Sequence, residues 1–373
     1  MSWSAVSAAQ DEDAGSEGAG WSKEAEEGES DMRKIFALLL AAMFAIAAAG
    51  CGAGGQDKSK VGSAEPSAGN RKITMGYSQI GAQSTWRAAH TASIKQAAED
   101  AGINLQFSNA ELKQENQIRA IRSFIAQKVD VIAFSPIVAT GWDEVLKEAK
   151  EAKIPVIVVD RDIQTNDDSL YVMRIGTDSV REGREAFRWL DGYMQEKGKK
   201  PRDGGTKFNI AEIKGPTGSS VVERRDMGFR DEMTASANKD RYEIIVAQNS
   251  TFQKDGGKQV MTEMLKTYKD KIDILFAQND DMALGAIEAI EAAGLKPGQD
   301  IVIVSCDGTR AIFQAMIEGK SNCTVEGNPL QGPLLMEMAK KVVAGDPVER
   351  TVFVKDSVYP AEIAPMAIQE RKY

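Results

Sequence analysis

Between residues 72 and 373, the hydrophobic positions follow two alternating patterns. Short apolar runs rich in β-branched residues predict a first set of buried strands at 72–80, 104–110, 129–137, 154–162 and 171–178. Segments with apolar residues at helical spacing separate them, as at 115–128 and 141–153. The alternation then restarts, with strands expected at 208–215, 242–249, 272–280, 301–308 and 322–329 and helices such as 281–294.

This alternation predicts the α/β fold class. Strands that are hydrophobic on both faces and joined by helices form parallel sheets. Because the series occurs twice in a chain of 373 residues, we expect two similar Rossmann-like lobes, each built on a parallel sheet.

The composition is different before this body. Residues 1–31 are acidic, rich in Gly and Ser and nearly free of aliphatic side chains, which predicts disorder. Residues 32–51 combine Met32 and two cations with a short apolar run, the pattern of a secretory signal peptide. As a helix, that run is about 22 Å long, shorter than the ~30 Å hydrocarbon core, so it is a poor permanent span.

The signal ends in AAGC (48–51), which resembles a bacterial lipoprotein lipobox with Ala48 at the position where that motif prefers leucine. The match implies cleavage before Cys51 and a lipid on its side chain. Because signals normally begin a chain, we expect translation to start at Met32. Residues 52–70 are rich in Gly, Ser and Lys and predict a flexible tether. The expected location is therefore the extracytoplasmic face of the cell membrane.

Charge and composition exclude several functions. The formal net charge is −9, and residues 1–51 account for −6 of it through nine acids and three bases, which leaves −3 for the body. A nearly neutral body has no basic field for nucleic acid. One histidine and three cysteines make a zinc site improbable. The body, residues 71–373, contains neither a G-x-G-x-x-G motif nor a Walker motif, and GPTGSS (215–220) reads as a plain turn, so we expect no cofactor.

Polar side chains recur at the carboxyl ends of the predicted strands, where open parallel sheets bind ligands. They are Asp160, Arg161, Asn279, Asp280 and Asp307, with Arg224 and Arg225 on the helix after 208–215. Any one of them could be a loop charge or a helix cap. As a set they indicate a binding site for hydroxyl groups, because carboxylates accept, guanidinium groups donate and an amide does both.

The segment QSTWRAAH (83–90) places Trp86 and Arg87 just before His90, the only histidine of the chain. Ser84 can cap a helix, which leaves Trp86 and Arg87 in its first turn. Trp86 and His90 share a helix face. For His90, a ligand contact and a supporting position away from the ligand are equally open alternatives.

The body resembles the periplasmic sugar-binding proteins of the ribose-binding type, the type I solute-binding proteins of ABC transporters. The likeness covers essentially residues 72–373 and rests on AQNDDMALGAIEAI, VDRD, SCDGT, ERRDMGF and IPVIVVD. It is closer still to the galactofuranose-binding branch, through QSTWRAAH, KQENQIRAIRSFIAQKVD, PIVATGW, VLKEAK and AGLKPGQDI.

The resemblance implies a set of sugar contacts. Matched motif by motif, they fall on Trp86, Arg87, Asp160, Arg161, Arg225, Asn279 and Asp307, with Phe252 closing the other face of the sugar. Glu326 is a further candidate, but it lies one residue before the family's glutamine position, so it faces the other side of a strand. His90 stands where the galactofuranose branch tends to have glutamate.

The resemblance also implies the architecture and the activity. Three crossovers, near residues 177–178, 327 and 358, would join lobe one (71–177 with 327–357) to lobe two (178–326 with 358–373). Hinge closure would bury a monosaccharide, galactofuranose-like or another pentose or hexose, between the lobes. The protein, a monomer anchored in the membrane through the lipid on Cys51, would deliver this sugar to ABC permease subunits.

Three alternatives compete with transport. A sensor that presents sugar to a chemoreceptor or histidine kinase would have the same soluble domain. A repressor effector domain shares the fold but needs a helix-turn-helix where this chain has a signal. An enzyme would need a nucleophile–base pair, a metal cluster or a cofactor loop, and the sequence offers none, so we expect no catalysis.

Two cysteines end consecutive predicted strands. Cys306 and Cys323 could form a disulfide in an oxidising location, or could be two buried free thiols. The sequence slightly favours the thiols.

Overall fold

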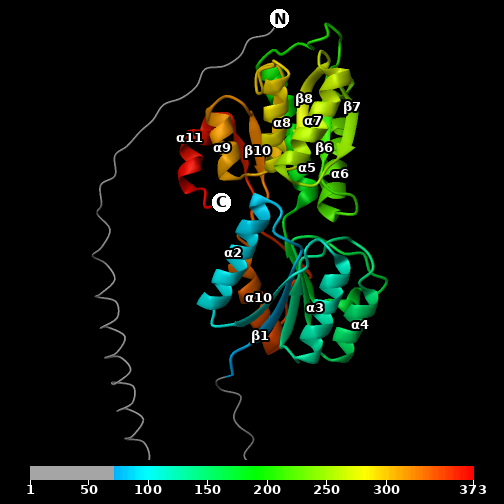
Figure 1. The fold of residues 1–373 in the computed structure, drawn as a ribbon, viewed down its shortest axis with the longest axis vertical. Coiled ribbons are helices and arrows are strands. Elements are labelled where there is room, and N and C mark those ends of the chain that lie inside the picture. Colours follow the sequence, from blue (N-terminus) through cyan, green and yellow to red (C-terminus); the bar gives the residue numbers. More distant parts are fainter. Residues whose placement is uncertain (1–70) are drawn as a thin grey trace, which may run out of the picture. The chain divides into compact units, whose positions relative to one another are not determined.

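The computed structural model describes residues 71–373, which form two lobes, each built on a six-stranded sheet (Figure 1). The predictions for residues 1–31, 32–51 and 52–70, and for a lipid on Cys51, lie outside the described residues. Across 71–373, no helix is both long and apolar enough to cross a membrane.

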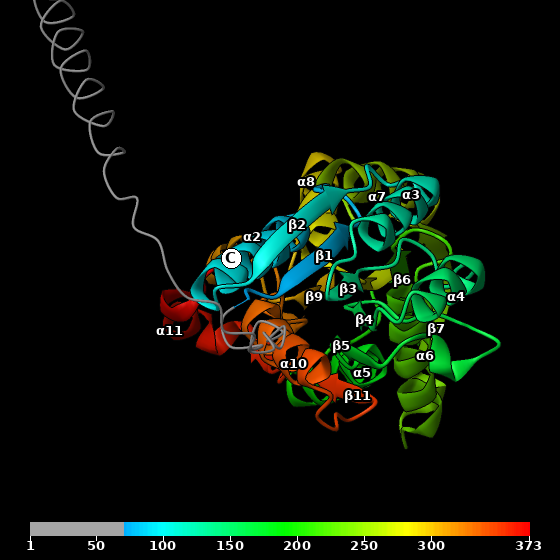
Figure 2. The same cartoon turned by 90° about the horizontal axis from the view of Figure 1, so that it is seen from below.

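The sheet of lobe one has the order β11-β5-β4-β3-β1-β2, and all of its strand pairs are parallel. The strands are β1 (Thr74–Gln79), β2 (Asn104–Asn109), β3 (Val131–Phe134), β4 (Val156–Val159), β5 (Met173–Gly176) and β11 (Thr351–Phe353). Four helices cover this sheet: α2 (Thr85–Asp100) and α10 (Gly332–Ala344) on one face, α3 (Gln114–Ala126) and α4 (Asp143–Glu151) on the other (Figure 2).

The sheet of lobe two has the order β12-β10-β9-β8-β6-β7. The strands are β6 (Phe208–Lys214), β7 (Tyr242–Asn249), β8 (Ile272–Ala277), β9 (Val302–Asp307), β10 (Cys323–Glu326) and β12 (Val358–Pro360). One face carries α5 (Ser179–Glu196) and α6 (Ser220–Ala235). The other carries α7 (Lys254–Tyr268), α8 (Asp280–Ala292), α9 (Arg310–Ile317) and α11 (Ala364–Ala367). Short 3-10 turns complete the chain: η1 (Asp168–Leu170), η2 (Lys239–Arg241), η3 (Ala361–Ile363) and η4 (Ile368–Glu370).

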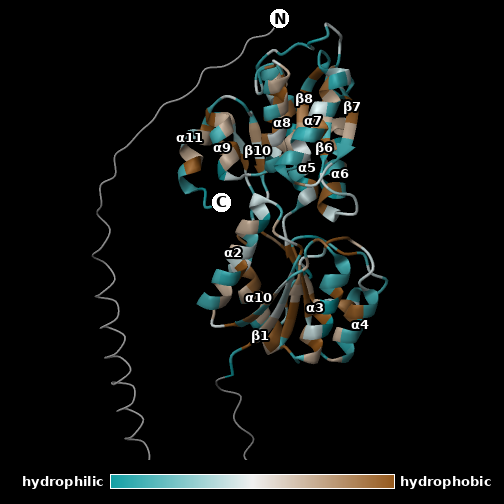
Figure 3. Cartoon of the chain, in the orientation of Figure 1, coloured by the Kyte–Doolittle hydropathy of each residue, from teal (hydrophilic) through white to brown (hydrophobic). Residues whose placement is uncertain are grey.

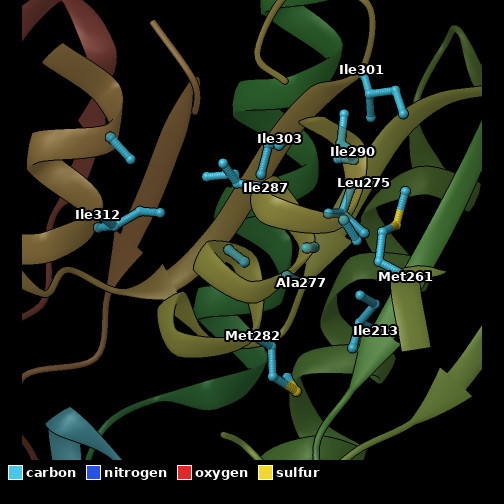
Figure 4. Packing of buried hydrophobic residues seen from close by; sticks show 14 of the residues in the cluster. Ile213, Met261, Leu275, Ala277, Met282, Ile287, Ile290, Ile301, Ile303 and Ile312 are labelled. Atoms are coloured by element: carbon cyan, nitrogen blue, oxygen red, sulfur yellow. The ribbon is translucent and has the colours of Figure 1, made fainter. Parts of the chain in front are cut away.

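Alternation along the strands builds a core on each face of each sheet. In β8, Ile274 and Phe276 pack against α5 and α6, while Leu275 and Ala277 pack toward α7 and α8 (Figure 4). Hydrophobic residues therefore concentrate in the central strands, and the outer helix faces are polar (Figure 3). The central strands are buried on both faces, as their apolar runs predict, whereas the edge strands β2, β7, β11 and β12 are only partly buried.

These sheets confirm the predicted α/β fold class with two parallel-sheet lobes. The chain passes between the sheets three times, after β5, after β10 and after β11. One strand departs from the pattern, since β12 pairs with β10 in antiparallel orientation. The sequence pattern did not predict β11 or β12, because three partly buried residues are too few to show a period.

The two cysteines of the body are free and buried. Cys323 pairs in register with Val304, and Cys306 pairs with Val325, so the two thiols are offset by two residues on neighbouring parallel strands. Strand spacing and rise then place their Cα atoms about 8 Å apart, beyond the reach of a disulfide. The structure favours the free-thiol alternative.

Candidate functional site

A cleft lies between the lobes, at the carboxyl ends of β4, β8 and β9. Its lining residues are Gln83, Ser84, Trp86, Arg87, Asp160, Arg161, Thr177, Val221, Arg225, Phe252, Asn279 and Asp307. Eight of the ten ligand contacts predicted from the sequence are in this set. The other two, His90 and Glu326, lie outside it.

Trp86 and Arg87 form the lobe-one wall at the start of α2. The Ser84 side chain accepts a hydrogen bond from the Arg87 backbone N–H, so it caps the helix as the sequence predicts. The Arg87 guanidinium lies 4.6 Å from the centroid of the Trp86 ring. Trp86 Nε1 donates to the carbonyl of Gly327 in the second crossover. The first turn of α2 therefore presents a ring and a guanidinium to the cleft.

Asp160 and Arg161 follow directly after β4. Asp160 accepts from Arg87 Nη2 at 2.6 Å, and Arg87 also donates from Nη1 to Gln79 Oε1 at 3.3 Å. Although burial opposes ionisation, Arg87 holds the pKa of Asp160 below its ordinary value. Arg174, which the sequence did not single out, donates to the Asp160 carbonyl at 2.8 Å. Among the described residues, Arg87 Nε has no partner, so a buried donor remains free in this wall.

Arg225 anchors the lobe-two wall from α6. Its guanidinium donates from Nε to Glu182 at 2.6 Å, from Nη2 to Asp307 at 2.9 Å, and from Nη1 to the carbonyl of Gln278. Although burial disfavours the charge, Glu182 and Asp307 keep the pKa of Arg225 well above its ordinary value. Each nitrogen of this guanidinium is already held by the protein.

Asn279 and Phe252 complete this wall. Asn279 caps α8 by accepting from the Met282 N–H at 3.0 Å, and its amide donates to the Phe252 carbonyl at 3.1 Å. The Phe252 ring occupies the space beside Gly215, where a Cβ would meet ring atoms at 2.2 Å. Glycine at 215 is therefore required for the ring to lie where it does.

Three cleft residues adopt left-handed backbone conformations. The φ angles are 67° at Asp160, 61° at Phe252 and 113° at Asp307. Such conformations are costly for residues with a Cβ and concentrate at functional sites. Asp160 follows β4 in the sheet of lobe one and Asp307 ends β9 in the sheet of lobe two, so each sheet contributes one such residue to the cleft from a strand end.

The buried charges of the cleft are paired with one another. Arg87 and Arg161 lie beside Asp160, and Arg225 pairs with Glu182 and Asp307, although burial raises the pKa of Asp307 above its ordinary value. An anion or cation in this place would leave a buried charge uncompensated, which is costly. The set is suited to a neutral ligand with many hydroxyl groups. Residues 71–373 contain no group of three or more His, Cys, Asp or Glu side chains placed to hold a metal ion.

Direct contacts between the lobes surround the cleft. Thr85 donates from its backbone N–H and its hydroxyl to Asp281 at 2.8 and 2.9 Å. On another side, Arg224 forms an ion pair with Asp162, whose N–H donates to Ser220 at 2.8 Å. The described conformation therefore has the two walls facing each other at short range.

Comparison with known proteins identifies the family. The model of the periplasmic binding protein domain matches residues 75–347, which is most of the chain. This chain belongs to the periplasmic binding protein domain family. The resemblance read from the sequence motifs is thereby confirmed.

One similar protein and two similar solved structures carry a furanose sugar in their names. The galactofuranose-binding protein YtfQ of Escherichia coli (strain K12) is 40% identical over 303 residues, covering 80% of this chain and 92% of YtfQ. A crystal structure from Mycobacterium smegmatis in complex with β-D-fucofuranose has 48% identity and a TM-score of 0.75, covering 81% of this chain and 95% of that one. The arabinose ABC transporter binding protein of Shewanella sp. ANA-3, bound to α- and β-L-arabinofuranose, has 40% identity and a TM-score of 0.74, covering 80% and 96%.

Two predicted residues of this family member lie away from the cleft. His90 is fully buried and stacks on the inner side of Trp86, with ring centroids 4.8 Å apart. Glu326 accepts from Arg371 at 2.7 Å and from the Tyr373 hydroxyl at 3.0 Å. The C-terminal segment thus holds Glu326 at the hinge, which agrees with the expected turn of its side chain to the other face of the strand.

Sequence reasoning missed Gln83, Ser84, Thr177 and Val221 as lining residues, although it predicted Ser84 as the cap of α2. Thr177 follows β5 at the same sheet edge as Asp160, so the strand-end argument could have found it. Gln83 lies in a loop, and Val221 lies among apolar residues of α6. Neither carries a pattern that separates it from ordinary loop or core positions.

Proposed function

We propose that this protein is an extracytoplasmic binding protein that captures a neutral monosaccharide in the cleft between its lobes. The observation that carries the proposal is the set of buried donors and acceptors that line the cleft and pair with one another, with an indole and a phenyl ring among the same lining residues. Aromatic rings cover the C–H faces of a sugar, and charged side chains bond its hydroxyls. Four or five such bonds, offset by ordering and desolvation, are enough for micromolar binding at about −8 kcal/mol.

We propose further that the sugar binds in its furanose form. Three proteins at 40–48% identity carry galactofuranose, fucofuranose or arabinofuranose in their names, and each aligns over at least 80% of this chain. D-galactose, D-fucose and L-arabinose share the same relative configuration around the ring. A single cleft therefore suits all three, and they are the candidates to test first.

The test is titration calorimetry of the purified protein against D-galactose, D-fucose, L-arabinose, D-ribose, D-xylose and D-fructose. We expect one of the first three to bind at micromolar or tighter affinity, and Arg161→Ala and Asn279→Ala to lose that binding. Arg122→Ala is the matched control, because Arg122 is exposed and pairs with Glu148 outside the cleft. Silence across the panel overturns the proposal, as does binding that survives both cleft substitutions.

We propose that the loaded protein delivers its sugar to an ABC importer and is held at the membrane by a lipid on Cys51. The name of the Shewanella relative supports an ABC transporter, and the signal-like segment 32–51 supports export. Cells that lack the gene should lose uptake of the radiolabelled sugar, and Cys51→Ala should release the protein from the membrane fraction. A sensing role would instead leave uptake intact.

A further inference from the structure

His90, the one histidine of the chain, is fully buried, and its contacts with Gln79 and Trp86 fix the orientation of its ring. We propose that His90 is a positioning residue, held as the neutral tautomer with its proton on Nε2, that fixes Arg87 through Gln79 and Trp86 through ring stacking for contact with the sugar. This inference rests on the proposed function, since it gives His90 a role in binding without contact with the ligand.

The orientation of the Gln79 amide is fixed first. Its Oε1 accepts from the Ile80 N–H at 3.0 Å and from Arg87 Nη1 at 3.3 Å. Both of these groups are donors only, so the oxygen must face them. The amide nitrogen therefore faces the other way, toward His90 Nδ1 at 3.1 Å and the Thr91 hydroxyl at 3.0 Å.

The His90 tautomer follows from the Gln79 orientation. An amide nitrogen can only donate, so Nδ1 must accept, and a neutral ring that accepts at Nδ1 carries its proton on Nε2. Arg87 Nη1 also lies 3.5 Å from Nδ1, a second donor on the same atom. A proton on Nδ1 would oppose both donors. Complete burial and the Arg87 charge, only partly offset by Asp160 and Gln331, lower the pKa of His90 to about 3.

The far side of the ring faces the second crossover. Within residues 71–373, His90 Nε2 has no hydrogen-bond partner, and neither has Gln331 Oε1, whose amide nitrogen donates to the Asn328 carbonyl at 3.2 Å. The Gln331 side chain is close enough to raise the pKa of His90, although the pair does not meet hydrogen-bond geometry in this conformation. The Nε2–H of His90 and the Oε1 of Gln331, a donor and an acceptor without partners, therefore lie close together beside the second crossover. The same crossover holds Trp86 through the carbonyl of Gly327.

The arrangement gives His90 two contacts with the lobe-one wall. Its Nδ1 orients Gln79, which in turn holds Arg87 beside Asp160. Its ring supports the indole of Trp86 from behind at an interplanar angle of 19°. Loss of the Nδ1 acceptor would leave the Gln79 amide nitrogen with the Thr91 hydroxyl alone, so the support that Gln79 gives to Arg87 would be weaker.

The first test uses the fact that the chain has one histidine. The protein, purified without a histidine tag and labelled with [¹⁵N]histidine, gives one imidazole spin system. We expect an unprotonated Nδ1 and a protonated Nε2, unchanged from pH 8 to pH 5. We also expect the Nε2 resonance to shift when D-fucose, D-galactose or L-arabinose saturates the cleft. A protonated Nδ1, a charged ring at pH 6, or a resonance indifferent to a bound sugar would overturn the proposal.

The second test separates the two ring nitrogens. In His90→Asn, the amide oxygen occupies the place of Nδ1, whereas in His90→Gln the amide lies near the place of Nε2. We expect His90→Gln to bind the sugar at least about tenfold more weakly than His90→Asn, because only asparagine restores the acceptor for Gln79. Thermal unfolding of both variants checks that they fold. Equal affinities in the two folded variants would overturn the positioning role.

The two proposals fail in different ways. If the wild-type protein binds no sugar of the panel, the proposed function fails and the positioning role fails with it. If the wild-type protein binds and the variants do not differ, only the positioning role of His90 is lost.

Discussion

The two walls of the cleft use arginines in opposite ways. In lobe two, Arg225 is engaged at all three nitrogens by Glu182, Asp307 and a backbone carbonyl. In lobe one, Arg87 contacts Asp160 and Gln79, and its Nε is unpartnered among the described residues. Both guanidinium groups are buried, at 4–5% exposure. The two arginines are therefore equally buried but differ in how many of their nitrogens the protein holds.

This difference indicates a division of labour. Arg225 neutralises two buried carboxylates at the hinge, so most of its interaction energy is present without ligand. Arg87 retains a buried donor, Nε, that has no partner among the described residues, so we expect more of its interaction energy to appear on binding. We therefore expect the loss of Arg225 to lower stability most and the loss of Arg87 to act mainly on affinity.

The largest effect should come from Arg225→Met. It removes the partner of buried Glu182 and Asp307, and breaking a buried ion pair costs about 3–5 kcal/mol. The free energy of unfolding in urea should fall by that amount, whereas sugar affinity should fall less than in Arg87→Met, because every nitrogen of Arg225 is already held by the protein. Arg224→Met is the matched control on the same helix, because Arg224 is 37% exposed in its pair with Asp162 and should cost about 0–1 kcal/mol. A similar loss of unfolding free energy in Arg225→Met and Arg224→Met would contradict the stabilising role of Arg225.

Arg87→Met should show the reverse balance. The loss of a charged hydrogen bond to the sugar, about 1.5–3 kcal/mol, weakens affinity by roughly tenfold to a hundredfold in calorimetry. The free energy of unfolding should fall less than in Arg225→Met, because Arg161 remains beside Asp160. An unfolding loss as large as that of Arg225→Met, with affinity unchanged, would contradict the division of labour.

The pH dependence of stability should differ in sign between the lobes. Burial and Arg87 lower the pKa of His90 to about 3, so below pH 6.5 the unfolded chain binds a proton that the folded chain does not. Stability from this group therefore falls as pH drops from 6.5 toward 3, by about 2 kcal/mol at pH 5. In lobe two, burial raises the pKa of Asp280 to about 6, so its contribution improves as pH falls from 6 toward 4.

The contribution of His90 to this pH dependence can be measured by comparing the wild type with variants that lack the imidazole. His90→Asn cannot titrate, so the gap in unfolding free energy between the wild type and this variant should narrow by about 2 kcal/mol from pH 7 to pH 5. His90→Gln should narrow the gap equally, because the effect depends only on the missing imidazole. A gap that stays constant with pH would show that His90 is accessible to protons in the folded state.

Much of the site could be predicted from sequence because parallel sheets bring strand ends together. Asn279 and Asp307 lie at the ends of neighbouring strands of the lobe-two sheet, so their meeting at one edge follows from topology, and Asp160 lies at the corresponding strand ends of lobe one. That the two edges face each other across a cleft came from the family resemblance. Arg225 was indicated both by its place on the helix after a strand and by the family resemblance, whereas Phe252 came from the resemblance alone. The place of Phe252 depends on a left-handed φ, which no periodic pattern encodes.

What the sequence did not predict depends on distant contacts. Glu326 is drawn to Arg371, 45 residues later, and β11 joins the first sheet from beyond the whole of lobe two. The His90 environment depends on Gln79 and Gln331, which lie on different elements and have ordinary local patterns. Such pairings follow from packing in three dimensions, so helix periodicity left the role of His90 open.

The smallest effect should arise where the walls touch directly. Thr85→Ala removes the hydroxyl bond to Asp281 and keeps the backbone bond. Because the hydroxyl bond lies at an exposed edge between the lobes, we expect it to contribute about 0.5 kcal/mol. The contact favours the closed form, so its loss should weaken sugar affinity by about twofold through faster dissociation, with the unfolding free energy unchanged. Stopped-flow tryptophan fluorescence measures this rate. Thr262→Ala is the control, because the Thr262 hydroxyl bonds only the Lys258 carbonyl of its own helix. An equal change of the dissociation rate in Thr262→Ala would show that the contact between Thr85 and Asp281 does not stabilise the closed form.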